Sequence, residues 1–310
     1  MRWASGQARA VFETAKGALP GDGTAVAVTA IDADGPAFAG TTWLPRDARF
    51  EIGSVTKTMT ATLLATLVLD GTVELDDPVG GWLDAGPNGD ITLEQLATHT
   101  SGLPRLAPDQ PVDWANPFRD LTAERAEEAL RAAARPPRAG HLYSNFGYQL
   151  LGIVLERASG HAYQDLLTER LFGPLEMTCS GVGGAGGGTR LAGNPVGHWD
   201  RALPAAGGIE STVADVARYL SACLHPQDGP LGRAITLCRQ PRVRIHEGRE
   251  IGLAWFIIGD VFRHNGRTGG FATCTAVNQA AERAMGALAN AAPRPDALLA
   301  NWVMPAISGD

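Results

Sequence analysis

The sequence predicts a mixed α/β fold of the α+β type, in which an antiparallel sheet is flanked by helices and carries an inserted, mainly helical lobe. β-rich segments lie near both ends of the chain, whereas residues 75–200 between them have helical or irregular patterns. Such an order is typical of one sheet built from the N- and C-terminal segments. With 310 residues, 45% of them apolar, the chain can bury a core. We therefore expect one domain over 1–310, with a sheet lobe (1–74 and 201–310) and a helical lobe (75–200).

The N-terminal segment is expected to form a surface helix followed by a hairpin. Residues 1–20 are charged and lack a compact apolar stretch before a small-residue cleavage site. They predict an amphipathic helix and not a secretory signal, and hence a cytoplasmic protein. The β-rich runs 24–29 and 38–43 are separated by Asp32-Ala33-Asp34-Gly35, which predicts a hairpin turn.

A buried helix is predicted from Ser54 to Asp70. The segment is apolar on nearly every side and closes at Gly71. A helix that is apolar all round lies in the middle of a domain. Ser54 would then stand at its N-terminal end, where backbone N–H groups and the helix dipole stabilise negative charge.

The remaining elements follow from capping signals, helical periodicity and β-rich runs. Capping boxes are predicted at Thr92 and Thr212, the second opening a helix that ends near Leu224. Six glycines within residues 181–188 predict a mobile loop without regular structure. Further helices are expected at 121–134, 148–158, 163–171 and 296–307, and further strands at 252–259, 261–264, 271–278 and 283–290.

Composition excludes several classes of partner and cofactor. The net charge of −7, the pI near 5.5 and the absence of a basic run argue against nucleic-acid binding. Arg242, Arg244 and Arg249 are interrupted by Glu247 and Glu250, so this stretch is interpreted as a solvated strand or loop face. No apolar run approaches the ~18 residues of a membrane span. The four cysteines and seven histidines show no metal-ligand spacing, so no metal is expected, and the cysteines are expected to be reduced and buried.

Lysine usage identifies a candidate nucleophile and base. Only two of the 26 basic residues are lysines, and one of them, Lys57, follows Ser54 by three positions at the predicted helix start. A guanidinium cannot give up its proton in a protein, whereas a lysine in a low-dielectric site can become a neutral base. Ser54 and Lys57 are therefore a candidate pair, the alternative being an ordinary helix with a solvated lysine.

Two further motifs carry groups suited to acyl chemistry. In Tyr143-Ser144-Asn145, a tyrosine with a pKa lowered by a neighbouring ammonium could relay protons, and Asn145 could hold a substrate carbonyl. In His264-Asn265-Gly266, followed by Arg267, the glycine would let an edge strand approach a substrate closely. Each motif alone also fits a half-buried aromatic residue or a turn histidine. His99 is interpreted as a structural loop residue.

Together these motifs resemble a known family. Ser54-Val55-Thr56-Lys57, Tyr143-Ser144-Asn145 and His264-Asn265-Gly266, in that order, look like the three motifs of the serine β-lactamase and penicillin-binding-protein superfamily. The chain is most similar to its class C-like branch, which includes carboxylesterases, D-aminopeptidases and D-alanyl-D-alanine carboxypeptidases. The resemblance covers residues 24–290 and extends to three other phrases: Leu96-Ala97-Thr98-His99-Thr100-Ser101-Gly102-Leu103, Gly207-Gly208-Ile209 and Gly252-Leu253-Ala254-Trp255.

The resemblance implies a β-lactamase/transpeptidase-like fold and an acyl-enzyme mechanism without a cofactor. Ser54 would attack a carbonyl after passing its proton to Lys57 or to a Tyr143 phenolate. The backbone N–H groups of Ser54 and Arg267 would hold the oxyanion, and Asn145 would orient the substrate.

The sequence departs from the pattern of the family in two ways. His264 stands where many relatives carry a lysine that recognises a carboxylate, which leaves that role to Arg267 if anionic substrates are used. The missing export signal disfavours a wall enzyme or a resistance lactamase.

Several functions stay open at this stage. The first expectation is a cytoplasmic serine hydrolase that cleaves a small ester or amide. The alternatives are an acyltransferase of the same fold, a β-lactamase or D-Ala-D-Ala carboxypeptidase, and an inactive homologue that only binds a ligand. The same residues serve hydrolysis and acyl transfer, and the pattern specifies neither the substrate nor the oligomeric state.

Overall fold

We describe a computed structural model of the chain, covering residues 2–3, 6–18, 24–108, 121–136, 140–193, 202–291 and 303–307. Within these ranges no helix has both the length and the apolar character needed to cross a membrane. Most of the predicted closing helix at 296–307 lies outside the described residues; its last turn is the short helix α10 (Met304–Ile307).

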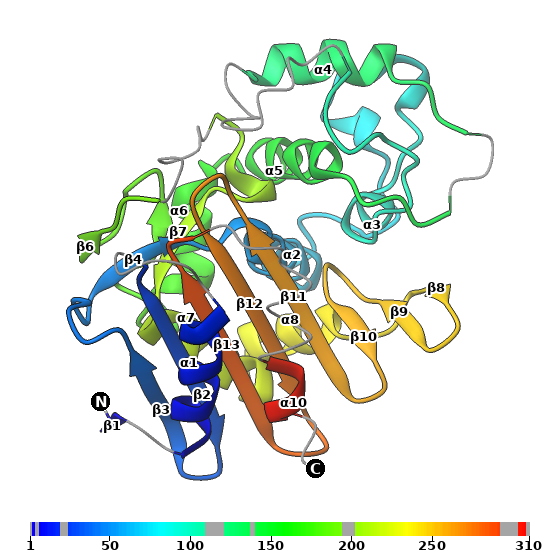
Figure 1. The fold of residues 1–310 in the computed structure, drawn as a ribbon. Helices are drawn as coiled ribbons and strands as arrows, with labels where there is room; N and C mark the ends of the chain where they lie inside the picture. Colours follow the sequence, from blue (N-terminus) through cyan, green and yellow to red (C-terminus); the bar gives the residue numbers. More distant parts are fainter. Residues whose placement is uncertain are drawn as a thin grey trace.

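A large, almost wholly antiparallel sheet forms the centre of the fold (Figure 1). Its strand order is β1-β3-β2-β13-β12-β11-β10-β9-β8, and only the β1–β3 pair is parallel. The chain ends therefore meet as predicted, since β2 pairs with β13. The strands are β1 (Arg2–Trp3), β2 (Val26–Asp32), β3 (Gly35–Gly40), β8 (Val243–His246), β9 (Arg249–Ile251), β10 (Phe256–Ile258), β11 (Val261–Arg267), β12 (Ala272–Asn278) and β13 (Arg283–Ala289).

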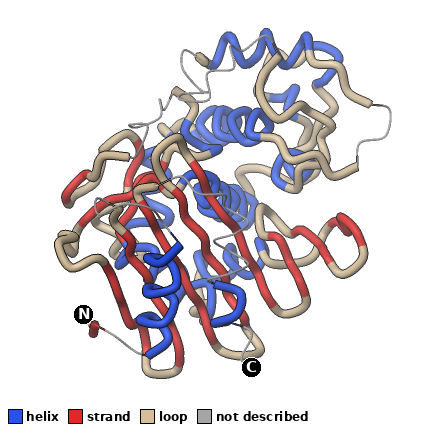
Figure 2. The backbone as a smooth tube through the Cα atoms, in the orientation of Figure 1, coloured by secondary structure: helices blue, strands red, loops and turns tan. Residues whose placement is uncertain are grey.

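Helices cover both faces of this sheet, which explains why its central strands are buried along their whole length. All seven residues of β12 are buried. Helix α1 (Gly6–Ala18), the predicted amphipathic helix, packs with α10 on one face. Helices α7 (Val213–Leu224), α8 (Pro230–Cys238) and α2 (Thr56–Leu69) lie on the other face (Figures 1 and 2). A sheet covered on both sides needs apolar residues on both, so its strands lose the alternation of an exposed sheet.

The helical region between the sheet segments lies beside the end of the sheet nearest α2 (Figure 1). Its helices are α3 (Leu93–Ala97), α4 (Ala123–Ala132), α5 (Asn145–Ser159) and α6 (Tyr163–Leu167), with a π-helical turn at Thr168–Phe172 and 3₁₀ turns at Val79–Gly81, Gly86–Asn88 and Pro204–Ala206. The capping box at Thr92 is confirmed, with both reciprocal hydrogen bonds to Gln95 present. Thr212 likewise caps α7 by accepting from the backbone N–H of Asp215.

A second, four-stranded sheet was not predicted. Its order is β5-β7-β4-β6, formed by β4 (Ala48–Glu51), β5 (Gly181–Val182), β6 (Thr189–Arg190) and β7 (Ile209–Thr212). The expectation of one sheet and of an irregular glycine-rich segment is therefore corrected, because the first two residues of that segment form β5. Its turn is held by the buried Arg49, whose Nη1 donates to the carbonyls of Gly184 (3.1 Å) and Gly186 (3.0 Å). Of these strands, β5 and β6 come from residues assigned to the helical lobe, whereas β4 and β7 come from residues assigned to the sheet lobe. The lobe boundaries themselves stay a prediction.

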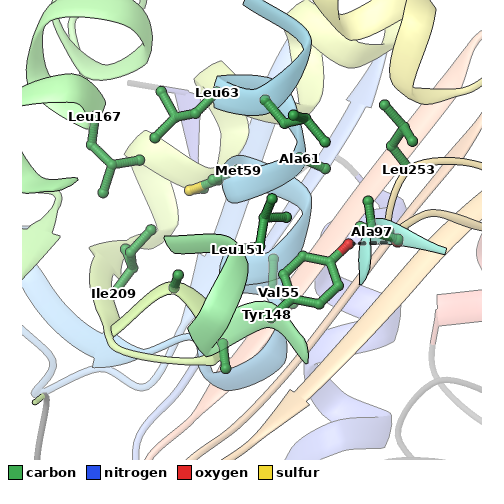
Figure 3. Close-up of a cluster of buried hydrophobic side chains, with 14 of the residues drawn as sticks. Val55, Met59, Ala61, Leu63, Ala97, Tyr148, Leu151, Leu167, Ile209 and Leu253 are labelled. Carbon is green, nitrogen blue, oxygen red and sulfur yellow. Dashed lines mark hydrogen bonds between the residues drawn. The ribbon is translucent and has the colours of Figure 1, made fainter. Parts of the chain in front are cut away.

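Helix α2 is buried on all sides, as its composition predicted. Every residue from Thr56 to Leu67 is buried, and the helix packs against α5, α6 and α8. Figure 3 shows Met59 and Leu63 among side chains from other elements, with the Tyr148 hydroxyl donating to the Ala97 carbonyl (2.8 Å). Buried threonines of α2 donate their hydroxyl protons to backbone carbonyls one turn earlier; Thr58 donates to the Val55 carbonyl, for example. The helix start that carries Ser54 is thus fixed by the centre of the core.

Candidate active site

Ser54 and Lys57 lie at the junction of a 3₁₀ turn (Gly53–Val55) and α2. Residues three apart on a helix share a face, so the local structure alone brings the two side chains together. Lys57 Nζ lies 3.1 Å from Ser54 Oγ. This separation is within the hydrogen-bond reach that a nucleophile and its base require.

Lys57 lies in a site that favours its neutral form. Its side chain has no exposed surface, and burial, assisted by the charge of Arg105, holds its pKa well below the ordinary value. Nζ donates to Asn145 Oδ1 (2.8 Å) and to the Ala206 carbonyl (2.5 Å), neither of which can donate back. A neutral amine has two N–H groups and one lone pair. In that form, donation to these two carbonyls uses both N–H groups and leaves the lone pair for the hydroxyl proton of Ser54.

The Tyr143-Ser144-Asn145 motif sits at the start of α5, where the loop at residues 99–105 holds it. The backbone N–H of Ser144 donates to His99 Nδ1 (3.1 Å), and that of Asn145 donates to the Arg105 carbonyl (2.9 Å). The Ser144 hydroxyl caps α5 by accepting from Gly147 N–H (2.9 Å). Since Asn145 Oδ1 accepts from Lys57, only its amide Nδ2 can donate to a substrate carbonyl.

The structure changes the expected role of Tyr143. Burial raises the pKa of Tyr143 to about 12, opposed by a hydrogen bond with Ser54 and by Arg105. The prediction of a lowered pKa and a phenolate base was wrong in direction, because desolvation outweighs the neighbouring charges. A neutral phenol can both donate and accept a hydrogen bond beside Ser54. Of the two predicted bases, only Lys57 has a pKa shifted toward its unprotonated form.

His99 belongs to this site, although sequence reasoning left it as a structural loop residue. It has a positive φ of 59° and is buried. Its ring lies 4.3 Å, centroid to centroid, from the ring of Tyr143. A strained backbone at a buried polar residue is common at functional sites. The sequence feature that could have indicated a role for His99 is its position within the Leu96–Leu103 phrase. Its contacts with Tyr143 and Ser144 are formed only in the folded protein.

The third motif lies on β11 and packs against the helix start. A Cβ atom on Gly266 would lie 1.9 Å from the Ile52 carbonyl oxygen and 2.9 Å from Ser54 N. A Cβ on Gly53 would lie 2.6 Å from Arg267 N. The glycines therefore let β11 approach the Ser54 turn, and not only a substrate as predicted. This approach brings the backbone nitrogens of Ser54 and Arg267 to the contact between β11 and the Ser54 turn.

β11 is an edge strand over only part of its length. In the sheet order it lies between β10 and β12. β10 pairs only with Val261–Arg263, so His264–Arg267 have no strand on that side among the described residues. This open edge faces the nucleophile, which is where an extended substrate could add its own backbone hydrogen bonds.

His264 is neutral and turned into the site. Burial, together with the charge of Lys57, lowers the pKa of His264 to about 3. Its Nδ1 lies 2.7 Å from the Asn265 carbonyl oxygen, which can only accept, so Nδ1 carries the proton. Nε2 is therefore an acceptor, and it is buried without a hydrogen-bond partner. His264 cannot supply the positive charge that a lysine would supply at this position.

The protonation of His264 should make the protein less stable in acid. Its folded pKa of about 3 lies below the ordinary 6.5, so between these values the unfolded chain binds more protons and the free energy of unfolding falls as pH falls. Above pH 6.5 the group has no such effect. Between pH 7 and pH 5, the free energy of unfolding should fall by about 2 kcal/mol more for the wild type than for His264→Gln, measured by urea unfolding. His161→Gln, at an exposed position, is the control. If the free energy of unfolding changed equally with pH in all three proteins, the lowered pKa of His264 would be contradicted.

A pocket of about 410 Å³ opens in front of Ser54. Tyr143, Phe256 and the segment His264–Arg267 line it, together with three arginines that sequence analysis did not assign to the site: Arg105, Arg249 and Arg263. Arg249 lies on β9, in the stretch interpreted as a solvated face, and the sheet turns that stretch toward the nucleophile. Among the residues that the structure describes, no three His, Cys, Asp or Glu side chains are grouped to hold a metal ion.

Comparisons with known proteins agree with this geometry. The chain is 33% identical over 218 residues to D-alanyl-D-alanine-carboxypeptidase/endopeptidase AmpH of Escherichia coli (63% of this chain, 54% of the relative). It is 31% identical over 211 residues to Penicillin-binding protein 4 of Amycolatopsis lactamdurans (59% and 52%) and 30% identical over 196 residues to Beta-lactamase of Escherichia coli (58% and 48%). The chain thus spans about half the length of these curated relatives.

Solved structures show the same fold. A class C beta-lactamase and a mutant of such an enzyme superpose with TM-scores of 0.81 and 0.82, at 18% and 19% identity, over 98% or more of both chains. The predicted fold class and superfamily are confirmed. The sequence model of the Beta-lactamase family matches residues 15–306, so the chain belongs to the Beta-lactamase family of serine hydrolases.

Proposed function

We propose that the protein is a serine hydrolase that cleaves a small ester or amide through an acyl-Ser54 intermediate, with Lys57 as the general base. The observation that carries this proposal is the buried amine of Lys57, which contacts Asn145 Oδ1 and the Ala206 carbonyl and lies 3.1 Å from Ser54 Oγ. Because burial lowers the pKa of this amine, Lys57 can take the proton of Ser54 across that distance.

Acylation begins when Ser54 Oγ attacks the substrate carbonyl carbon and its proton passes to Lys57 Nζ. The resulting oxyanion accepts hydrogen bonds from the backbone N–H groups of Ser54 and Arg267. The C–O or C–N bond then breaks, and the proton returns through Tyr143 to the leaving oxygen or nitrogen. The neutral phenol suits this relay because it can donate one proton while accepting another.

Deacylation repeats the same steps with water as the nucleophile. Water attacks the acyl carbon, its proton passes to Lys57, and Ser54 leaves with that proton restored. If an amine or alcohol reaches the acyl-enzyme in place of water, the same residues perform acyl transfer. The expected acyltransferase alternative therefore differs only in the acceptor. The cytoplasmic location and the small-molecule partner expected from sequence stay predictions.

Mass spectrometry of the intact protein tests the nucleophile. Brief exposure to 4-nitrophenyl butyrate is expected to add one butyryl group, mapped to the peptide with Ser54, and Ser54→Ala should show none. A separate exposure to a penicillin tests the β-lactamase and carboxypeptidase alternatives. Products measured with and without an added amine separate hydrolysis from transfer. Absence of both an adduct and turnover with either reagent would contradict the proposal and favour an inactive binding protein.

A further inference from the structure

The pocket beside Ser54 is strongly basic on a protein with a net charge of −7. Four arginines line it: Arg105, Arg249, Arg263 and Arg267. No aspartate or glutamate is among its described lining residues. Since the overall balance of the chain is acidic, this local excess of positive charge is not a by-product of composition.

Three of these arginines have no ion-pair partner among the described residues. Arg105, Arg249 and Arg267 form no salt bridge with any residue that the structure describes, and Arg249 Nε is buried without a hydrogen-bond partner. Eight arginines elsewhere are paired with carboxylates: Arg49, Arg131, Arg135, Arg157, Arg170, Arg190, Arg218 and Arg242. An unpaired guanidinium at a pocket wall is available to a ligand.

Three separate elements converge to build this charge. Arg105 comes from the loop before α5, and its guanidinium carbon lies 5.1 Å from the ring centroid of Tyr143. Arg249 comes from β9, and Arg263 comes from β11, where it pairs with Phe256 of β10. His264 contributes no charge, because it is neutral and presents an acceptor. The basic character therefore lies around the pocket rim and not at the position of His264.

We propose that the substrate of this site is an ester or amide bearing at least two negative charges, carboxylates or phosphates, which Arg105, Arg249 and Arg267 bind. A guanidinium offers paired N–H donors that match a carboxylate or phosphate, and several of them around one pocket match more than one such group. This inference rests on the proposed hydrolase function and specifies its substrate class. It also explains how the site accommodates an anion without a lysine at position 264.

A graded series of 4-nitrophenyl esters tests the substrate class. Butyrate carries no charge, the glutarate monoester carries one and the tricarballylate monoester carries two. We expect kcat/KM to rise about tenfold with each added charge, which corresponds to one charge-assisted hydrogen bond of modest strength. Added salt should reduce this rise, because it screens the charges. Equal kcat/KM across the series, with acyl-Ser54 formed from butyrate, would overturn this inference while leaving the hydrolase proposal intact.

Matched variants assign the effect to the pocket. Arg249→Gln and Arg267→Gln should each reduce the ratio of kcat/KM for the tricarballylate and butyrate esters by about tenfold. Arg244→Gln, at an exposed position of β8 outside this pocket, should leave the ratio unchanged. Thermal unfolding checks that each variant is folded. A ratio reduced equally by all three substitutions would overturn the assignment, since it would reflect general charge and not this site.

Binding gives a readout that does not need turnover. Calorimetry with folded Ser54→Ala should detect tricarballylate, with weaker binding of glutarate and no binding of neutral glutaramide. Inorganic phosphate and pyrophosphate in the same assay distinguish phosphate from carboxylate recognition. If Ser54→Ala binds none of these anions, the inference fails even where the wild-type protein forms an acyl-enzyme.

Discussion

Replacing Lys57 by arginine is expected to abolish acylation even though the positive charge is kept. An arginine cannot become a neutral base, so Ser54 would lose the group that takes its proton. We expect kcat/KM to fall by about 10²- to 10⁴-fold, the usual contribution of a general base. Wild-type acylation should also slow as pH falls through the lowered pKa of Lys57, because only the unprotonated amine accepts a proton. The rate of acyl-Ser54 formation, followed by mass spectrometry, measures both effects.

Lys57→Ala is the companion variant, because a guanidinium is larger than the amine that this fully buried position holds. Removing the amine also frees Asn145 Oδ1 and the Ala206 carbonyl, so thermal unfolding is measured for both variants. A folded Lys57→Arg protein with wild-type acylation would show that Lys57 acts only as a fixed charge, and the proposed base would then be wrong.

Gly266→Ala should impair catalysis by moving β11 away from the nucleophile. The new Cβ would lie 1.9 Å from the Ile52 carbonyl oxygen, closer than any real contact, so the strand must shift. The N–H groups of Ser54 and Arg267 would then no longer converge on one oxyanion. We expect kcat/KM to fall by about 10²- to 10³-fold, as when an oxyanion donor is removed, with a loss of stability of about 1–3 kcal/mol from overpacking.

Gly17→Ala in α1 is the matched control. A Cβ there meets no atom within 4 Å, so the helix should keep or slightly raise its stability and the activity should not change. Steady-state kinetics and urea unfolding are compared for the two variants. Gly266→Ala with wild-type kcat/KM would show that the close approach of β11 has no part in oxyanion binding.

Features that depend on neighbouring residues were predictable from the sequence. The helical spacing places Lys57 one turn after Ser54, and the all-round apolar pattern marks α2 as a core helix. The hairpin was predicted from its turn residues, and the structure indeed leaves only Ala33 and Asp34 between β2 and β3. The joint order of three motifs indicated the family, because motifs that are weak alone become specific together.

Features that depend on contacts between distant residues were not predictable. The small sheet joins two-residue strands whose pairing has no local signal, and α8 was missed as well. The pKa of Tyr143 was predicted in the wrong direction because its burial cannot be read from its neighbours in sequence. Arg249 was interpreted as solvated because Glu247 and Glu250 flank it, yet neither carboxylate lines the pocket.

By itself, then, the sequence determined the candidate nucleophile, the candidate base beside it and the class of fold, since these follow from helical spacing, apolar pattern and motif order. Only the tertiary structure decided that burial lowers the pKa of Lys57. The acceptors of its two N–H groups, Asn145 and Ala206, lie 88 and 149 residues further along the chain. The same holds for the arginines around the pocket, which three separate elements bring together. Desolvation and charge convergence are properties of a packed interior, and they arise only once distant segments meet.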